Sequence, residues 1–186
     1  WIREQLPEMQ KNLGTLLALD IDFSYHAPTA NWKHTRSLLL DHANHELDLL
    51  HFLTGHKPFT MRKLHDSFDY YSIAGKQEEG CTFTFRGTRR LTASHFLENV
   101  TLRFERGSLF MDAHKGEARL YEHEQAQTKV YAVPPTDYAL RGKRTLENFA
   151  NAILKKEPVY LTPQDLYLNT ACGVVLTEEG ELSWPG

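Results

Sequence analysis

The sequence lacks an excess of positive charge and any long apolar run. Lys and Arg number 21 against 24 Asp and Glu, which gives a formal net charge of −3. We therefore expect no nucleic-acid partner, because no basic field exists to hold a phosphate backbone. No apolar segment approaches the roughly 20 residues that cross a bilayer, so we expect no membrane partner either.

Cysteine is scarce, and the chain lacks an initiator Met and a signal-peptide pattern. Cys81 and Cys172 could form one bridge, but their spacing matches no paired motif. We expect two free, buried thiols in a reducing cytoplasm. The first residue is Trp1, and we expect further protein upstream of it. The 186 residues suffice for one well-buried domain, which we expect to span residues 1–186.

The sequence also lacks the glycine-rich turn Gly-x-Gly-x-x-Gly of dinucleotide-binding domains. That turn and the helix after it cradle a pyrophosphate through backbone N–H groups. We therefore expect no cofactor-binding residues in this chain and no tight binding of a dinucleotide by the chain alone.

Hydrophobic periodicity predicts secondary structure at both ends of the chain. Helical spacing of apolar residues predicts helices over 2–13, 38–54 and 146–156, the last capped by Thr145. A further helix is predicted to begin at Pro163, capped by Thr162, with a packing face suited to the sheet. We expect that face to comprise Leu166, Asn169, Thr170, Gly173 and Val174.

Alternation of apolar and polar residues in the middle of the chain predicts a series of strands without helices between them. Alternation also predicts a strand over 17–25. Successive strands predict an antiparallel sheet, and the whole pattern predicts one α+β domain. Arg86, Arg89 and Arg90 predict a solvated edge that discourages strand pairing. Further strands are expected at 81–85, 90–94, 100–104, 108–111, 118–121 and 130–133.

The 38–54 helix carries the residues with the clearest chemistry. Asp41 and His45 are four apart and share one helix face, which Asp48 continues. A carboxylate can orient an imidazole and stabilise its charged form, and histidine is a natural acceptor for a hydroxyl proton. The same spacing also occurs in ordinary surface ion pairs. His42 and His45 do not meet the zincin pattern, because position 49 is Leu, and we expect no metal.

The string from Leu38 to Gly55 resembles the signature helix of one oxidoreductase family, that of glucose–fructose oxidoreductase, inositol dehydrogenase and rhizopine catabolism proteins (Gfo/Idh/MocA). Their pattern runs Gly-Gly-x-Leu-x-Asp-x-Gly-x-His-x-x-Asp and ends in Leu-x-Gly. Asp41, His45 and Asp48 match its polar positions, and the segment 53–55 matches its end. The order of the flanking elements is also similar over nearly the whole chain.

This resemblance implies the carboxy-terminal half of a two-domain enzyme. Its fold would be a large open, mostly antiparallel sheet with helices on one face, like that of dihydrodipicolinate reductase or glyceraldehyde-3-phosphate dehydrogenase. An amino-terminal Rossmann domain, absent here, would bind NAD or NADP, and the isolated chain would be inactive. His45 would be the proton acceptor or donor and Asp41 would orient the substrate. The sheet would join a homodimer or tetramer.

The resemblance further implies a sugar or polyol substrate. Trp32 could cover a sugar ring or fill a domain seam. Where the family pattern has glycines, this chain has Arg36, Ser37 and Ala43. We expect these larger residues to narrow the substrate pocket or to change its charge. An alternative is a non-catalytic dimerisation or ligand-binding domain derived from the family. The expected substrate-binding residues are Asn31, Trp32, Lys33, Arg36, Asn44 and Asp48.

Overall fold

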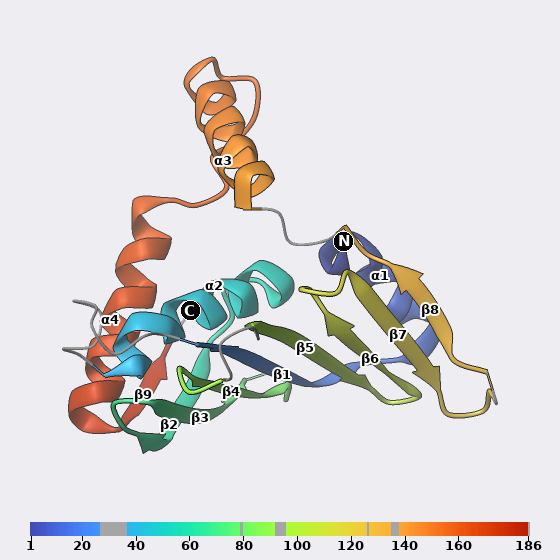
Figure 1. Cartoon of the computed structure of the whole chain (residues 1–186), viewed down its shortest axis with the longest axis horizontal. Coiled ribbons are helices and arrows are strands. Elements are labelled where there is room, and N and C mark those ends of the chain that lie inside the picture. Colours follow the sequence, from blue (N-terminus) through green and yellow to red (C-terminus); the bar gives the residue numbers. More distant parts are fainter. Residues whose placement is uncertain (27–36, 79, 92–95, 126, 135–137, 186) are drawn as a thin grey trace.

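The computed structural model describes residues 1–26, 37–78, 80–91, 96–125, 127–134 and 138–185. In this part of the chain, four helices lie on one side of a nine-stranded sheet (Figure 1). The helices are α1 (Ile2–Leu13), α2 (Leu38–Thr54), α3 (Tyr138–Ile153) and α4 (Pro163–Glu179). The strands are β1 (Leu16–Tyr25), β2 (Phe59–Asp66), β3 (Tyr70–Gln77), β4 (Thr82–Thr88), β5 (Phe96–Phe104), β6 (Gly107–Asp112), β7 (Glu117–Glu122), β8 (Lys129–Ala132) and β9 (Glu181–Trp184).

The sheet confirms the predicted fold class. Its strand order is β8-β7-β6-β5-β1-β4-β3-β2-β9. The β1–β4 pair is parallel and the other seven pairs are antiparallel. The first strand therefore lies in the middle of the sheet, with one flank built from β5 to β8 and the other from β4, β3, β2 and β9. The domain is α+β with a mostly antiparallel sheet, as expected.

The first two helices follow the predicted bounds because their apolar spacing is strictly helical. Ile2, Leu6, Met9 and Leu13 of α1 are all buried. Ser37 caps α2 by accepting a hydrogen bond from the backbone N–H three residues on. The inner face of α2 packs on the sheet. The buried residues of α2 are Leu38, Leu39, Ala43, Glu46, Leu47, Leu50, His51 and Leu53.

The last two helices differ from the predictions. Helix α3 begins at Tyr138, eight residues before the expected start, so Thr145 lies inside the helix rather than at its cap. Thr162 does cap α4, and Asp165 completes a capping box. The predicted packing face of α4 is wrong in part, because Leu166 and Val174 are exposed. The buried residues are Leu168, Asn169, Cys172, Gly173 and Leu176, because α4 packs mainly against α2 rather than on the sheet.

The expected arginine edge is also wrong. Strand β4 lies in the sheet interior between β1 and β3, and Arg86 pairs with Asp22 of β1 at 3.0 Å. Arg89, which follows β4, is only 2% exposed. The sequence could not show this, because the acid that pairs with Arg86 comes from a strand 64 positions away. Strands β2, β3 and β9 were not among the strands expected. The strand expected at 90–94 lies mostly outside the described residues, and Arg90 forms only an isolated bridge with His26.

Two further predictions concern the cysteines and the membrane. Cys81 and Cys172 are free and buried, as expected. Burial raises the pKa of the Cys172 thiol to about 11. Among the described residues, none of the helices is long and apolar enough to cross a membrane.

Gly87 lies where β4 passes close to its neighbours. A Cβ atom there would stand 2.4 Å from the Phe23 carbonyl oxygen and 2.7 Å from the Tyr71 ring. We expect Gly87→Ala to lower the free energy of unfolding by about 1–3 kcal/mol, because backbone must shift. Gly142→Ala, in open space on α3, should instead raise it by up to about 1 kcal/mol. Urea unfolding checks both, and equal values for the two variants would contradict the packing argument.

Candidate functional site

The outward surface of α2 carries four of the predicted site residues. Asp41, Asn44, His45 and Asp48 recur at helical spacing opposite the buried residues of α2, and we call them the α2 outward face. His45 is exposed, whereas the other three are half-buried. The Asn44 side-chain oxygen is buried and accepts no hydrogen bond from the described residues. The face therefore presents an imidazole, two carboxylates and an amide side chain whose oxygen has no donor among the described residues.

Tyr25, the last residue of β1, lies against this face. Its hydroxyl donates to Asp41 Oδ2 at 3.4 Å. Its ring stacks on the ring of His42, with centroids 4.8 Å apart, and His42 in turn meets His45 edge-on at 5.6 Å. Sequence reasoning missed Tyr25 and gave His42 no role in a site, because the contact joins a strand end to a helix 16 residues later. The structure thus links Asp41 to His45 through two rings.

Tyr25 is held in its neutral form. Burial raises the pKa of its phenol, and the negative charge of Asp41 raises it further. The positive charge of buried Arg89 acts in the opposite direction. A neutral phenol keeps its proton and can donate it to a carboxylate or to a bound hydroxyl group.

Asp48 connects the α2 outward face to α4. Burial raises the pKa of its carboxyl, and the charge of Asp165 adds to this. The charge of His45 and a hydrogen bond from Asn169 lower the pKa. Asp165 itself pairs with His56 Nε2 at 3.1 Å. Asp48 is therefore the acid that interacts electrostatically with His45.

Asp41 does not contact His45 in the way that the spacing suggested. Within the described residues, no hydrogen bond or ion pair joins the two side chains, and the Asp41 carboxylate accepts from Tyr25 instead. The His45 ring instead meets the His42 ring edge-on. A role for Asp41 in orienting a substrate stays a prediction.

Two of the departures from the glycine pattern do not narrow this face. Ala43 is fully buried and points to the sheet, away from the α2 outward face. The Ser37 hydroxyl caps α2 and donates to Asp66 at 2.8 Å. The expected obstruction is therefore wrong for these positions. The remaining predicted residues, Asn31, Trp32, Lys33 and Arg36, lie outside the described residues.

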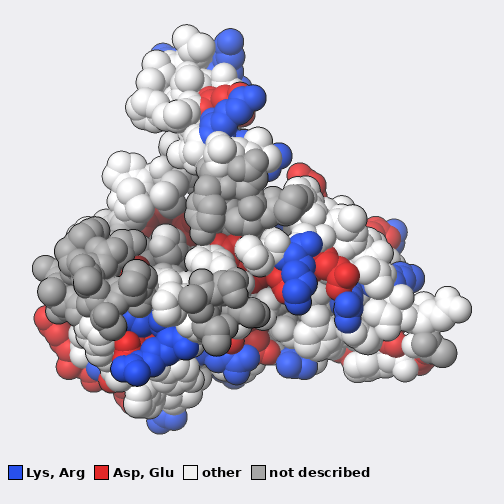
Figure 2. Space-filling view, in the orientation of Figure 1, with Lys and Arg blue, Asp and Glu red and all other residues white. Residues whose placement is uncertain are grey.

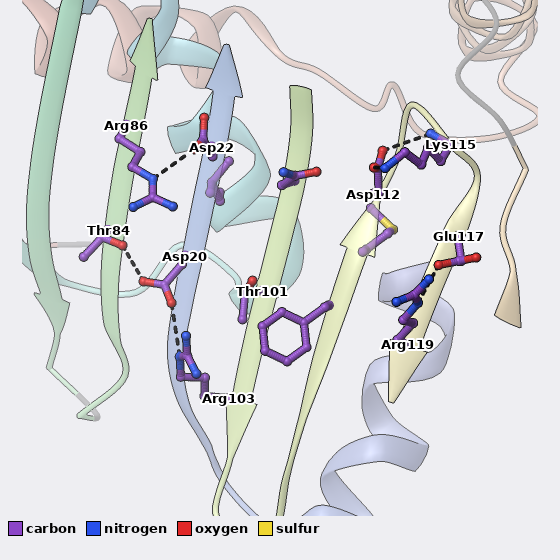
Figure 3. Close-up of a pocket in the computed structure, with 14 residues that line it drawn as sticks. Asp20, Asp22, Thr84, Arg86, Thr101, Arg103, Asp112, Lys115, Glu117 and Arg119 are labelled. Atoms are coloured by element: carbon purple, nitrogen blue, oxygen red, sulfur yellow. Dashed lines mark hydrogen bonds and ion pairs between the residues drawn. The ribbon is translucent and has the colours of Figure 1, made fainter. Parts of the chain in front are cut away.

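A second concave region lies on the opposite, open side of the sheet. This groove of about 610 Å³ crosses β4, β1, β5, β6 and β7 (Figure 3). Asp20 accepts from Thr84 and pairs with Arg103, and Asp22 pairs with Arg86 (Figure 3). These charges neutralise one another within the face, which leaves it polar but free of strong single-sign charge.

Among the described residues, neither region contains a group of side chains that could hold a metal ion. The described part of the chain holds no group of three or more His, Cys, Asp or Glu side chains that could bind a metal. The sequence has no glycine-rich turn followed by a helix to receive a pyrophosphate.

Comparisons with solved structures identify the fold. A levoglucosan dehydrogenase in complex with NADH and levoglucosan superposes with a TM-score of 0.79 at 14% identity, over 99% of this chain and 62% of that one. A UDP-N-acetylglucosamine 3-dehydrogenase from Acidithiobacillus ferrooxidans gives 0.71 at 16%, over 92% and 56%. An NAD-binding oxidoreductase from Klebsiella pneumoniae gives 0.75 at 11%, over 97% and 61%.

These likenesses establish the fold, which recurs in NAD-dependent sugar dehydrogenases. The chain spans less than two thirds of the length of each of these structures. No protein-family profile matches the sequence, and no curated protein matches it.

Proposed function

We propose that this chain is the substrate-binding half of an NAD(P)-dependent oxidoreductase of the Gfo/Idh/MocA family, acting on a hydroxyl of a sugar or polyol. The observation that carries the proposal is the α2 outward face, which presents His45 beside Asp41 and Asp48 on a fold shared with sugar dehydrogenases. A nicotinamide takes up the hydride in such oxidations. It would be held by an amino-terminal Rossmann domain, because this chain has no dinucleotide cradle.

The residues of this chain would transfer the proton and bind the substrate. His45 is exposed and takes the hydroxyl proton as the carbon is oxidised, or returns it in reduction. Asp48 lies one helical turn from His45 on the α2 outward face, where a carboxylate is placed to interact with an imidazolium as it forms. Asp41, held by the Tyr25 hydroxyl, and the half-buried Asn44 side chain orient neighbouring substrate hydroxyls. Asn31, Trp32, Lys33 and Arg36 complete the substrate pocket in this proposal.

The open sheet face is the proposed contact between subunits. Its charges are paired within the face, Asp22 with Arg86 and Asp20 with Arg103, so a second copy could cover the face without meeting a strong charge of one sign. It lies on the opposite side of the sheet from α2, so a homodimer or tetramer formed there leaves the α2 outward face accessible (Figure 1).

The first experiment compares the natively expressed gene product with the 21.5 kDa chain. We expect a protomer larger by roughly 13 kDa, the size of one nucleotide-binding domain of about 120 residues. It should change NAD(P)H fluorescence saturably, whereas the 186-residue chain should not. Sedimentation should give two or four protomers. A native mass near 21.5 kDa without NAD(P)H binding would reject the enzyme and favour a non-catalytic dimerisation or ligand-binding domain.

A further inference from the structure

Helix α3 stands away from the rest of the domain as an arm (Figure 1). Asn148 of α3, which is 4% exposed, ties the helix to the segment that leads back to α4. Its side-chain amide donates to the Pro158 carbonyl at 2.9 Å and to Glu157 at 3.1 Å, and its oxygen accepts from the Tyr160 backbone N–H at 2.9 Å. The return segment to α4 is thus fixed to the helix.

The apolar side of this arm faces away from its own domain. Leu146, Phe149 and Ile153, which we call the α3 apolar face, are 70%, 59% and 64% exposed. The opposite, polar side of α3 lines a hollow of about 1490 Å³ shared with α1, the end of α2 and α4, to which it contributes Arg144 and Asn148. A surface helix normally turns its apolar stripe to its own core. The reversed orientation indicates that a separate structural unit covers the α3 apolar face.

The surroundings of the α3 apolar face define the chemistry of that unit. Gly142 lies on the same side, with open space where a side chain would be, so another backbone can approach closely. The arm, residues 138–161, has five Lys or Arg and two Glu, a net charge of +3 in a chain whose total is −3. Figure 2 shows the protruding arm as mostly uncharged, with Lys and Arg at its margin and an acidic patch beside them. The complementary surface is apolar at its centre and acidic at its rim.

The position of α3 indicates which structural unit covers the α3 apolar face. Helix α3 lies on the same side of the sheet as α2, and therefore on the side from which a nicotinamide must reach His45 (Figure 1). The structure with bound NADH and levoglucosan matches 99% of this chain, and 38% of its own length lies outside the match. This chain has no dinucleotide motif. Under the proposed function, the domain that binds NAD(P) is therefore a separate one.

We propose that the α3 apolar face docks the nucleotide-binding domain, so that α3 is the arm that holds this domain over the α2 outward face. The inference rests on the proposed function. It adds to that function a defined interface, formed by Leu146, Phe149 and Ile153 with a basic margin.

Hydrogen exchange in the complete gene product tests the interface. We expect amides of 142–153 to exchange at least tenfold more slowly in the complete protein than in the 186-residue chain, because docking covers the helix. Phe149→Glu with Ile153→Glu should abolish this protection and lower turnover. Phe149→Ala, a milder change, should reduce both effects. The matched control is Tyr167→Glu on α4, where the native side chain is 75% exposed and lies outside both proposed interfaces, and it should change neither.

The outcomes separate the two proposals. If the complete protein does not bind NAD(P)H, the proposed function fails and this inference fails with it. If it binds NAD(P)H but α3 exchanges at the same rate with and without the remaining protein, the docking proposal alone is overturned. If the 186-residue chain self-associates and Phe149→Glu reverses both association and protection, the α3 apolar face joins two copies of this chain, which also overturns the proposal.

Discussion

His45→Asn is expected to lower kcat/KM of the complete protein by about 10²- to 10⁴-fold, the range that a lost general acid–base contributes. His45 is the exposed imidazole on the α2 outward face, and Asn cannot take up the proton that leaves the substrate hydroxyl. Asn retains a polar side chain of similar reach at an exposed position, so the fold should persist. Steady-state kinetics with the physiological sugar or polyol measures the effect.

The loss should fall mainly on kcat, because the proton transfer stabilises the transition state rather than the bound substrate. NAD(P)H affinity and the subunit number should stay unchanged. His123→Asn is the matched control, since His123 is also exposed but follows β7, far from α2 in the fold. Turnover by His45→Asn equal to that of His123→Asn would remove His45 from the mechanism.

The α2 outward face was predictable because a single helix contains it. Helical periodicity alone places Asp41, His45 and Asp48 on one side, and the structure agrees. Tyr25 was not predictable in the same way. Its contact with Asp41 and His42 depends on where β1 ends relative to the start of α2, and local spacing does not encode that distance.

The errors concern elements whose surroundings were unknown. The face of α4 was predicted for a sheet, but α4 meets α2 instead, and this rotates the buried side from Leu166 to Leu168. The arginines near β4 were expected at an edge because sequence does not reveal strand order. Once β1 lies beside β4, Asp22 becomes the partner of Arg86. In each case the missing information is a contact between segments far apart in the chain.

Glu46 should make the stability of the domain depend on pH. It lies on the side of α2 opposite His45 and is fully buried, where it accepts a hydrogen bond from the Tyr71 hydroxyl. Burial raises the pKa of its carboxyl well above the usual 4.5, and the charge of Asp22 adds to this, while the hydrogen bond from Tyr71 lowers it. The native domain therefore holds a proton on Glu46 that the unfolded chain releases.

The sign follows from this difference in bound protons. Below about pH 4.5 Glu46 is protonated in both the folded and the unfolded state, so it does not make the free energy of unfolding depend on pH. Above it, the unfolded chain ionises first, so the free energy of unfolding falls by up to about 1.4 kcal/mol per pH unit until the folded pKa is reached. His51 acts oppositely at lower pH. Burial lowers its pKa from 6.5 to about 4, so stability rises with pH between these values and partly masks Glu46.

Glu46→Gln isolates the contribution of Glu46. The amide oxygen can still accept from Tyr71, but an additional buried NH₂ group should lower stability by about 1–3 kcal/mol at pH 5. Above pH 6.5, His51 no longer changes the slope of stability against pH. The native protein should lose stability there as pH rises, whereas the variant should not, so the difference in free energy of unfolding between them should shrink. Urea unfolding from pH 5 to 9 measures this, with exposed Glu78→Gln as the control that follows the native curve. Tyr71→Phe should keep the slope and extend it to higher pH, because the loss of its hydrogen bond raises the pKa of Glu46 further. Parallel curves for Glu46→Gln and the native protein above pH 6.5 would show that Glu46 does not titrate in that range.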